Sequence, residues 1–207
     1  MQRTRIKICG ITREEDLRCA VAAGADAIGL VFYAPSPRYL MATRAAELVR
    51  RLPPFVTSVG LFVNEPASTV KAVLQKLPLQ LLQFHGEEDE AYCASFGLPY
   101  IKAARVKPGL DLVEYAKSFA SAGALLLDAH VDSYGGSGKT FDWSLIPAGL
   151  PLPLVLSGGL HAGNVAAALA AVKPWAVDVS SGVEAAPGVK DAEKIAQFVA
   201  EVRMADA

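Results

Sequence analysis

The sequence has 207 residues, of which 52% are hydrophobic and 20% are charged, and its formal net charge is −1. This length and hydrophobic share suffice for one large core, so we expect a single domain over residues 1–207. A near-neutral chain without a basic tract argues against nucleic acid or an anionic membrane as a partner, since both recruit clustered lysine and arginine.

The chain shows no targeting or metal-binding pattern. No stretch comes near the roughly 20 apolar residues that cross a bilayer, and the first residues contain no apolar signal region, so we expect a cytoplasmic protein. The three cysteines, Cys9, Cys19 and Cys93, lack the spacing of a disulfide framework or a zinc site. We therefore expect no metal, and any functional cysteine acts as a thiol.

Short apolar runs alternate with longer amphipathic stretches along the whole chain. The runs that we expect to form strands are 6–9, 27–32, 58–63, 79–84, 100–103, 124–127, 154–156 and 176–179. Helical patterns between them include 14–23, 44–52 and 165–172. About eight β/α units without a linker favour a single (β/α)8 TIM barrel, in which chemistry sits on the loops after the strands. An open flavodoxin-like sheet is the alternative fold.

The first strand alternates so that Lys7 and Cys9 share one face while Ile6 and Ile8 share the other. In a barrel, the isoleucines meet the helices and Cys9 points toward the mouth with an ammonium group below it. This setting favours a thiolate that acts as a base near neutral pH. The alternative is a buried, inert cysteine.

Two further strand ends carry side chains that suit a ligand. Arg38 follows the second strand in a loop stiffened by two prolines, so its guanidinium is held over the mouth, where it suits a carboxylate or a phosphate. The alternative is a solvated arginine. His85 ends the fourth strand on the same face as Gln83, and it is either a substrate contact or a core histidine with satisfied hydrogen bonds.

Asp128 closes the apolar run of the sixth strand at the expected mouth of the barrel. Partial burial favours the protonated carboxyl of a general acid, whereas the structural alternative is a loop carboxylate that caps a turn. The glycine-rich stretch 131–140 that follows suits a mobile lid, although an unstructured connector is the simpler explanation. Residues 135–140 end like a Walker A loop, but the spacing of the first glycine and the residues that follow argue against nucleotide hydrolysis.

Two glycine turns follow the last two strands, 157–159 and 180–182, and they predict a phosphate site. Glycine there lets backbone N–H groups approach an anion closely. The residues that we expect to bind phosphate are Gly158, Gly159, Ser180, Ser181 and Gly182. Ser181 and Glu184 have the spacing of a capping box, which predicts a short helix whose positive end faces the same anion. Either turn alone is equally typical of an ordinary strand end, but the pair indicates a phosphorylated small molecule.

Together these motifs resemble the phosphoribosylanthranilate isomerase family over nearly the whole chain. The segments that carry the resemblance are Lys7–Thr12, Gln83–Glu87, Tyr134–Trp143, Leu156–Leu160 and Val177–Glu184. The resemblance implies a cofactor-free Amadori rearrangement in tryptophan biosynthesis that converts N-(5-phosphoribosyl)anthranilate into 1-(2-carboxyphenylamino)-1-deoxyribulose 5-phosphate. The cysteine-bearing first strand combined with the last motif is the most specific part of the match.

The resemblance also implies a role for each candidate residue. Asp128 matches the general acid and Cys9 the general base. Arg38 is expected to hold the anthranilate carboxylate, with Asp178 assisting at the mouth. Gly159, Ser181 and Gly182 are expected to supply amides to the phosphate. The resemblance leaves open whether the chain works as a monomer or as a homodimer.

Two other functions fit part of the same pattern. An Amadori isomerase of histidine biosynthesis, which acts on an aminoimidazole ribonucleotide, shares the phosphate turns, but that family has an aspartate where Cys9 stands and usually a longer chain. A noncatalytic sugar-phosphate sensor with Cys9 as a redox switch lacks a resolving cysteine nearby in sequence.

Overall fold

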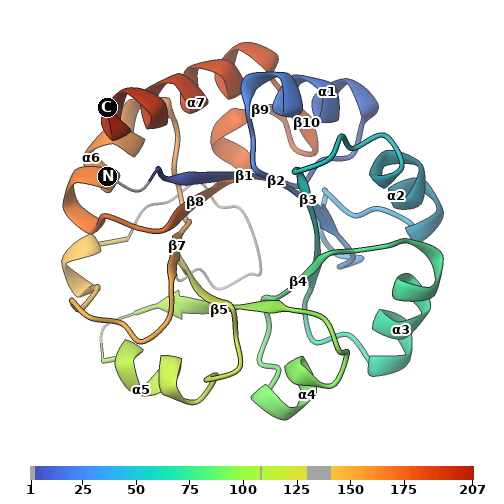
Figure 1. Cartoon of the computed structure of the whole chain (residues 1–207), viewed down its shortest axis with the longest axis horizontal. Coiled ribbons are helices and arrows are strands. Elements are labelled where there is room, and N and C mark those ends of the chain that lie inside the picture. The colour runs from blue at the N-terminus through green and yellow to red at the C-terminus, as the bar shows by residue number, and fades with distance from the viewer. Residues whose placement is uncertain (1–2, 108, 130–140) are drawn as a thin grey trace.

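The computed structural model describes residues 3–107, 109–129 and 141–207. Eight parallel strands form a closed barrel in which each strand pairs with the next and β8 pairs with β1 (Figure 1). They are β1 (Arg5–Cys9), β2 (Ala27–Val31), β3 (Thr57–Phe62), β4 (Leu81–Phe84), β5 (Tyr100–Val106), β6 (Ala124–Ala129), β7 (Leu154–Leu156) and β8 (Ala176–Val179). The predicted (β/α)8 fold is confirmed, and the flavodoxin-like alternative was wrong.

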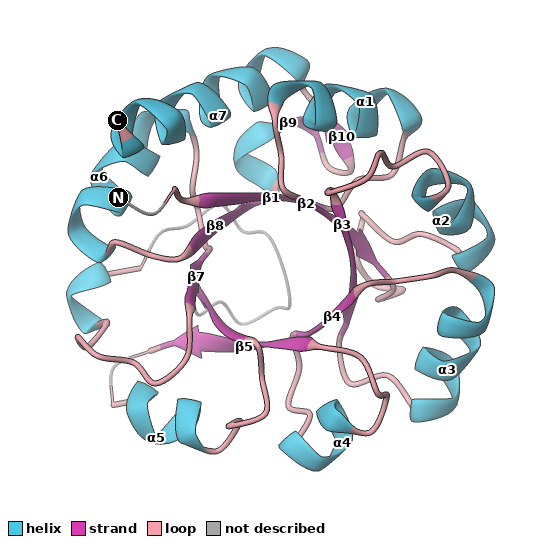
Figure 2. Ribbon diagram, in the orientation of Figure 1, coloured by secondary structure: helices cyan, strands magenta, loops and turns pink. Residues whose placement is uncertain are grey.

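The helices form a ring outside the strands (Figure 2). They are α1 (Glu14–Ala23), α2 (Ala42–Val49), α3 (Ala67–Lys76), α4 (Glu90–Ala94), α5 (Leu112–Lys117), α6 (Ala162–Val172) and α7 (Ala192–Asp206), with the 3₁₀ turns η1 (Trp143–Leu145) and η2 (Ser181–Val183). The short antiparallel strands β9 (Glu184–Ala186) and β10 (Val189–Lys190) form a separate hairpin between β8 and α7. This hairpin is an addition to the eight expected units.

The main apolar core lies between the barrel and its helices. Ile6 and Ile8 of β1 are fully buried in it together with Leu17 of α1 and Phe198 of α7. The predicted alternation of the first strand is therefore confirmed. Because the isoleucines take the outer face, Lys7 and Cys9 remain on the face that lines the barrel.

The ends of the described chain are tied to each other. The backbone N–H and the hydroxyl of Thr4 donate to the Asp206 carboxylate at 2.9 and 2.6 Å. Figure 1 shows α7 closing the ring of helices between α6 and α1. This closure places β8 and its turn beside β1 and Cys9.

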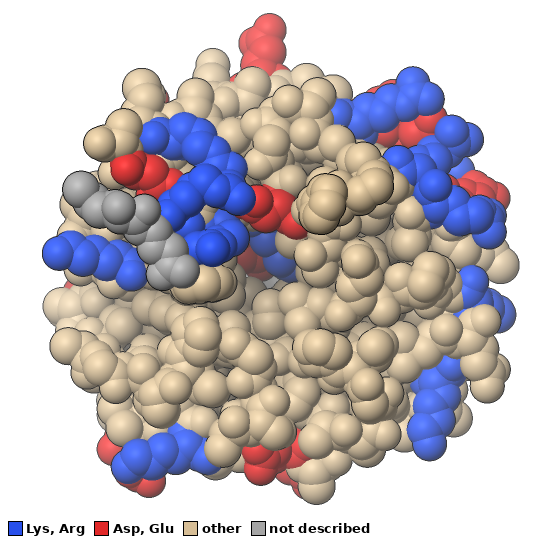
Figure 3. Space-filling model, in the orientation of Figure 1, with Lys and Arg blue, Asp and Glu red and all other residues tan. Residues whose placement is uncertain are grey.

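The surface shows charges of both signs. On the face in view in Figure 3, lysine and arginine lie beside aspartate and glutamate around the edge, and uncharged residues cover most of the middle. Among the helices that the structure describes, none combines the length and the apolar composition needed to cross a membrane.

Candidate active site

Cys9 stands at the carboxyl end of β1, where its side chain is 5% exposed. Its neighbour on β2 is Gly29, and a methyl group added there would lie only 2.7 Å from the Cys9 sulfur. The missing side chain of Gly29 thus makes room for the thiol. Below Cys9, the Lys7 ammonium pairs with the Asp178 carboxylate of β8 at 2.8 Å, and both side chains are buried.

Three effects act on the Cys9 thiol. Burial raises its pKa, and the nearby Lys7 only partly offsets this effect. Asp178 raises the same pKa and also pairs with Lys7. The expectation that Cys9 acts as a thiolate base near neutral pH stays a prediction, and burial is the main effect that opposes it.

Asp128 lies in β6 near its carboxyl end and is held by hydrogen bonds from two directions. Its Oδ1 accepts from the backbone N–H of Ala129 at 2.8 Å, and its Oδ2 lies 3.1 Å from His85 Nε2. The other ring nitrogen of His85 lies 3.0 Å from the amide nitrogen of Gln83. His85 is thus placed as a partner of the acid candidate.

The two glycine turns that were predicted to share one phosphate are in contact. A methyl group at Gly182 would lie 1.9 Å from the carbonyl oxygen of Leu160, which directly follows the first turn. Gly158 has a φ of +85°, and a methyl group there would lie 2.6 Å from the Ala129 nitrogen. Only glycine allows these close approaches. The turns after β7 and β8 therefore lie beside each other and next to the Asp128–Ala129 segment.

The short helix predicted after the second turn forms only as a single 3₁₀ turn, without a capping box. Residues Ser181–Val183 make one 3₁₀ turn, η2, and Glu184 continues into β9. The side chain of Glu184 does not cap this turn. Its carboxylate pairs with Arg38, which is distant in sequence, and with Lys190, which lies across the hairpin. The capping-box prediction was wrong because these ion pairs compete for the same carboxylate.

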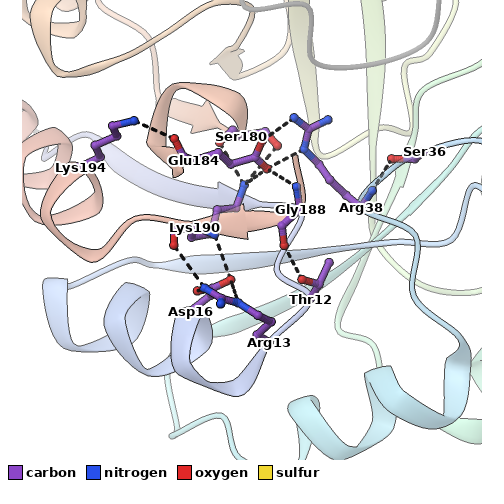
Figure 4. A network of polar contacts seen from close by, with 10 residues as sticks. All are labelled: Thr12, Arg13, Asp16, Ser36, Arg38, Ser180, Glu184, Gly188, Lys190 and Lys194. Carbon is purple, nitrogen blue, oxygen red and sulfur yellow. Dashed lines mark hydrogen bonds and ion pairs between the residues drawn. The ribbon is translucent and has the colours of Figure 1, made fainter. Parts of the chain in front are cut away.

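Arg38 is buried and paired. Its Nε and Nη2 donate to the two carboxylate oxygens of Glu184, each at 2.7 Å, and Lys190 Nζ donates to Oε1 of the same carboxylate at 2.9 Å (Figure 4). A methyl group at Gly10 would lie 2.5 Å from Arg38 Cδ and 3.2 Å from Ser180 Oγ. The side chain of Arg38 thus lies close to the end of β1 and to the glycine turn after β8. Its guanidinium is paired with Glu184 and is not a solvated group.

Lys190 and the ion-pairing role of Glu184 were absent from the sequence-based prediction. Both depend on the β9–β10 hairpin, which brings Lys190 back to Glu184 and to the carbonyl oxygen of Ser180, 3.0 Å from its Nζ. The Pro187-Gly188 dipeptide is the only local signal for this turn, and Gly188 has a φ of +78°. The proposed lid at 131–140 and the rejected Walker-like segment lie outside the described residues.

Comparison with known proteins identifies the family of this chain. The family model for N-(5'phosphoribosyl)anthranilate (PRA) isomerase matches residues 6–201. An N-(5'-phosphoribosyl)anthranilate isomerase of Dechloromonas aromatica is 65% identical over 204 residues, which cover 99% of this chain and 98% of that protein.

Solved structures agree with this match. The phosphoribosyl anthranilate isomerase of Thermus thermophilus superposes with a TM-score of 0.89 at 36% identity and covers 97% of this chain and 99% of that one. A second phosphoribosyl anthranilate isomerase, solved with reduced 1-(o-carboxyphenylamino)-1-deoxyribulose 5-phosphate, gives a TM-score of 0.85 at 41% identity with the same coverage. This chain belongs to the N-(5'-phosphoribosyl)anthranilate isomerase family.

Proposed function

We propose that the chain catalyses the Amadori rearrangement of N-(5-phosphoribosyl)anthranilate to 1-(2-carboxyphenylamino)-1-deoxyribulose 5-phosphate in tryptophan biosynthesis, with Asp128 as general acid and Cys9 as general base. The observation that carries this proposal is the placement of both residues at the carboxyl ends of strands of one closed barrel, beside two phosphate-type turns that touch. A relative of the same fold binds the reduced form of this product.

In the first step, the protonated carboxyl of Asp128 gives its proton to the ribose ring oxygen. The bond between C1 and that oxygen breaks, and the nitrogen lone pair forms a cationic imine at C1. The hydrogen bonds with His85 and with the Ala129 amide hold the carboxyl in one orientation, which favours transfer along one path.

In the second step, the Cys9 thiolate removes the proton from C2, and the electrons of that bond neutralise the imine nitrogen to give an enolamine. The positive charge of the imine acidifies C2 and also favours the thiolate over the thiol. The proton on Cys9 then passes to C1, and the C2 hydroxyl proton passes to the Asp128 carboxylate. These transfers give the ketone and restore the thiolate of Cys9 and the carboxyl of Asp128.

Substrate binding uses the two turns and Arg38. Backbone amides of Gly158, Gly159, Ser181 and Gly182 are assigned to the phosphate, with Ser180 at the base of the second turn. Glu184 occupies the Nε edge of Arg38, so the edge formed by Nη1 and Nη2 is assigned to the anthranilate carboxylate. Asp178 acts on the site indirectly, through its ion pair with Lys7, and not by contact with the substrate.

The test is to generate N-(5-phosphoribosyl)anthranilate in situ and follow the loss of its fluorescence. Wild-type protein should turn it over, whereas Cys9→Ala and Asp128→Asn should each lower kcat by roughly 10²- to 10⁴-fold. Cys19→Ala, a change of a half-buried cysteine in α1, is the matched control and should keep the wild-type rate. Near-normal turnover by Cys9→Ala would rule out the thiolate base, and turnover of only the histidine-pathway substrate would replace the proposed reaction.

A further inference from the structure

Lys190 is a buried cation outside the segments on which the sequence-based prediction rested. It lies in β10 and is 4% exposed, and its Nζ donates to the Ser180 carbonyl at 3.0 Å and to Glu184 Oε1 at 2.9 Å. Figure 4 shows the side chains of Lys190 and Arg38 both pointing toward Glu184. Lys190 thus joins the hairpin to the turn assigned to the phosphate and to the arginine assigned to the carboxylate.

The charges of this group do not cancel. Arg38, Glu184 and Lys190 are all at least about nine-tenths buried, and they comprise two cations and one anion. Arg13 and Asp16, which both form hydrogen bonds with the backbone of Lys190, form an ion pair with each other and add no net charge. A surplus positive charge is costly to bury unless an anion completes the group. The cluster therefore carries one positive charge that a further anion would balance.

The position of the surplus charge matches one end of the substrate. A methyl group at Gly10, the residue after the proposed base, would meet both the stem of Arg38 and the hydroxyl of Ser180, so Arg38 lies near the end of β1 and near the turn assigned to the phosphate. Glu184 occupies only the Nε and Nη2 side of the guanidinium. A substrate carboxylate on the Nη1 and Nη2 edge would share the guanidinium with the carboxylate of Glu184. Without Lys190 as a second cation, these two carboxylates would compete for the single positive charge of Arg38.

We propose that Lys190 is a specificity-determining residue for the carboxylate of the substrate: it neutralises Glu184 so that the charge of Arg38 serves the anthranilate group. This inference rests on the proposed function. With the substrate bound, Arg38 and Lys190 balance Glu184 and the anthranilate carboxylate, and the cluster is neutral. Glu184 in turn holds the guanidinium in a fixed orientation, because a two-point hydrogen bond restricts its rotation.

The experiment measures binding of two ligands, the reduced product analogue and the same analogue without the ring carboxylate. Lys190→Met should weaken binding of the first by about tenfold or more and leave binding of the second within about twofold of wild type. The double variant Lys190→Met, Glu184→Gln again has one surplus positive charge and should regain most of the lost affinity. In turnover, Lys190→Met should raise KM with little change in kcat.

Lys194→Met is the matched control, since its ammonium donates to the backbone carbonyl of Glu184 at 2.8 Å and, among the described residues, forms no ion pair with the Glu184 carboxylate. This variant should bind both ligands with wild-type affinity. Equal weakening of both ligands by Lys190→Met, or a double variant no better than the single one, would overturn the role of Lys190. If the wild-type protein bound both ligands equally, Arg38 would not bind the ring carboxylate, and the proposed substrate binding would fail together with the role of Lys190. Failure of the Lys190 role alone is thus distinguished from failure of the proposed function.

Discussion

Lys7 and Asp178 act on the Cys9 thiol in opposite directions. Burial raises the pKa of Cys9, Lys7 lowers it and Asp178 raises it. Lys7→Met should therefore move the titration of Cys9 to higher pH, and Asp178→Asn should move it to lower pH by leaving the ammonium unpaired. The thiolate absorbance of each variant, measured against pH with Cys9→Ala as the blank, gives the shift. Shifts in the same direction would show that packing, and not charge, controls the thiol.

His85 offers a second test at the scale of one residue. If it positions Asp128, His85→Ala should lower kcat by roughly 10- to 100-fold with KM nearly unchanged, because a misplaced acid loses the aligned geometry of proton transfer. His85→Gln retains an N–H donor and should recover part of the rate. A raised KM with an unchanged kcat would instead support the direct substrate contact that the sequence suggested.

At the scale of elements, the two glycine turns that we assign to the phosphate depend on the close packing of their backbones. A methyl group at Gly182 would lie 1.9 Å from the Leu160 carbonyl oxygen, so Gly182→Ala must push the turns apart. We expect a loss of roughly 1–3 kcal/mol in stability from this overpacking. The spacing of the amides should widen with it, and inorganic phosphate should bind more weakly.

A calorimetric titration with phosphate and a thermal melt check this prediction. Gly123→Ala is the control, because its methyl group would meet only the Tyr100 carbonyl oxygen at the ordinary distance of 3.5 Å. Weaker phosphate binding by both variants would point to a general effect of the added methyl group and contradict the role of the contact between the turns.

At the scale of the whole molecule, Asp26 connects the chain start to the barrel. Its carboxylate accepts from both terminal nitrogens of Arg3 and from the Ile6 N–H at 2.9 Å. Although burial favours the neutral acid, the hydrogen bonds from Arg3 and Ile6 hold the pKa of Asp26 below its ordinary value of 3.8. Its contribution to stability is therefore complete above pH 3.8 and is lost as the pH falls through the lower pKa of the folded state.

Asp26→Asn should accordingly cost about 1 kcal/mol at neutral pH, the usual value of a partly buried hydrogen-bonded group. Thermal melts of both proteins between neutral and acidic pH should show their difference shrinking below pH 3.8. A difference that stays constant down to low pH would mean that the charge of Asp26 does not contribute.

Local pattern in the sequence predicted which end of the barrel carries the candidate residues. Alternation in β1 assigned Ile6 and Ile8 to the helix layer, and Cys9 follows them on the inner face because side chains of a strand alternate. Asp128 and the turns at 157–159 and 180–182 end apolar runs, and in a parallel barrel all such ends meet at one rim.

The sequence by itself determined the eight strands, their faces and the rim on which the candidate residues gather, because these follow from short-range periodicity. Only the tertiary structure decided the charge state of the site. Lys7 pairs with Asp178 across 171 positions and Arg38 with Glu184 across 146, and a folded-back hairpin adds Lys190. Electrostatic interactions depend on distance in space and on burial, so the raised pKa of Cys9 and the surplus charge beside Arg38 appear only when the barrel closes.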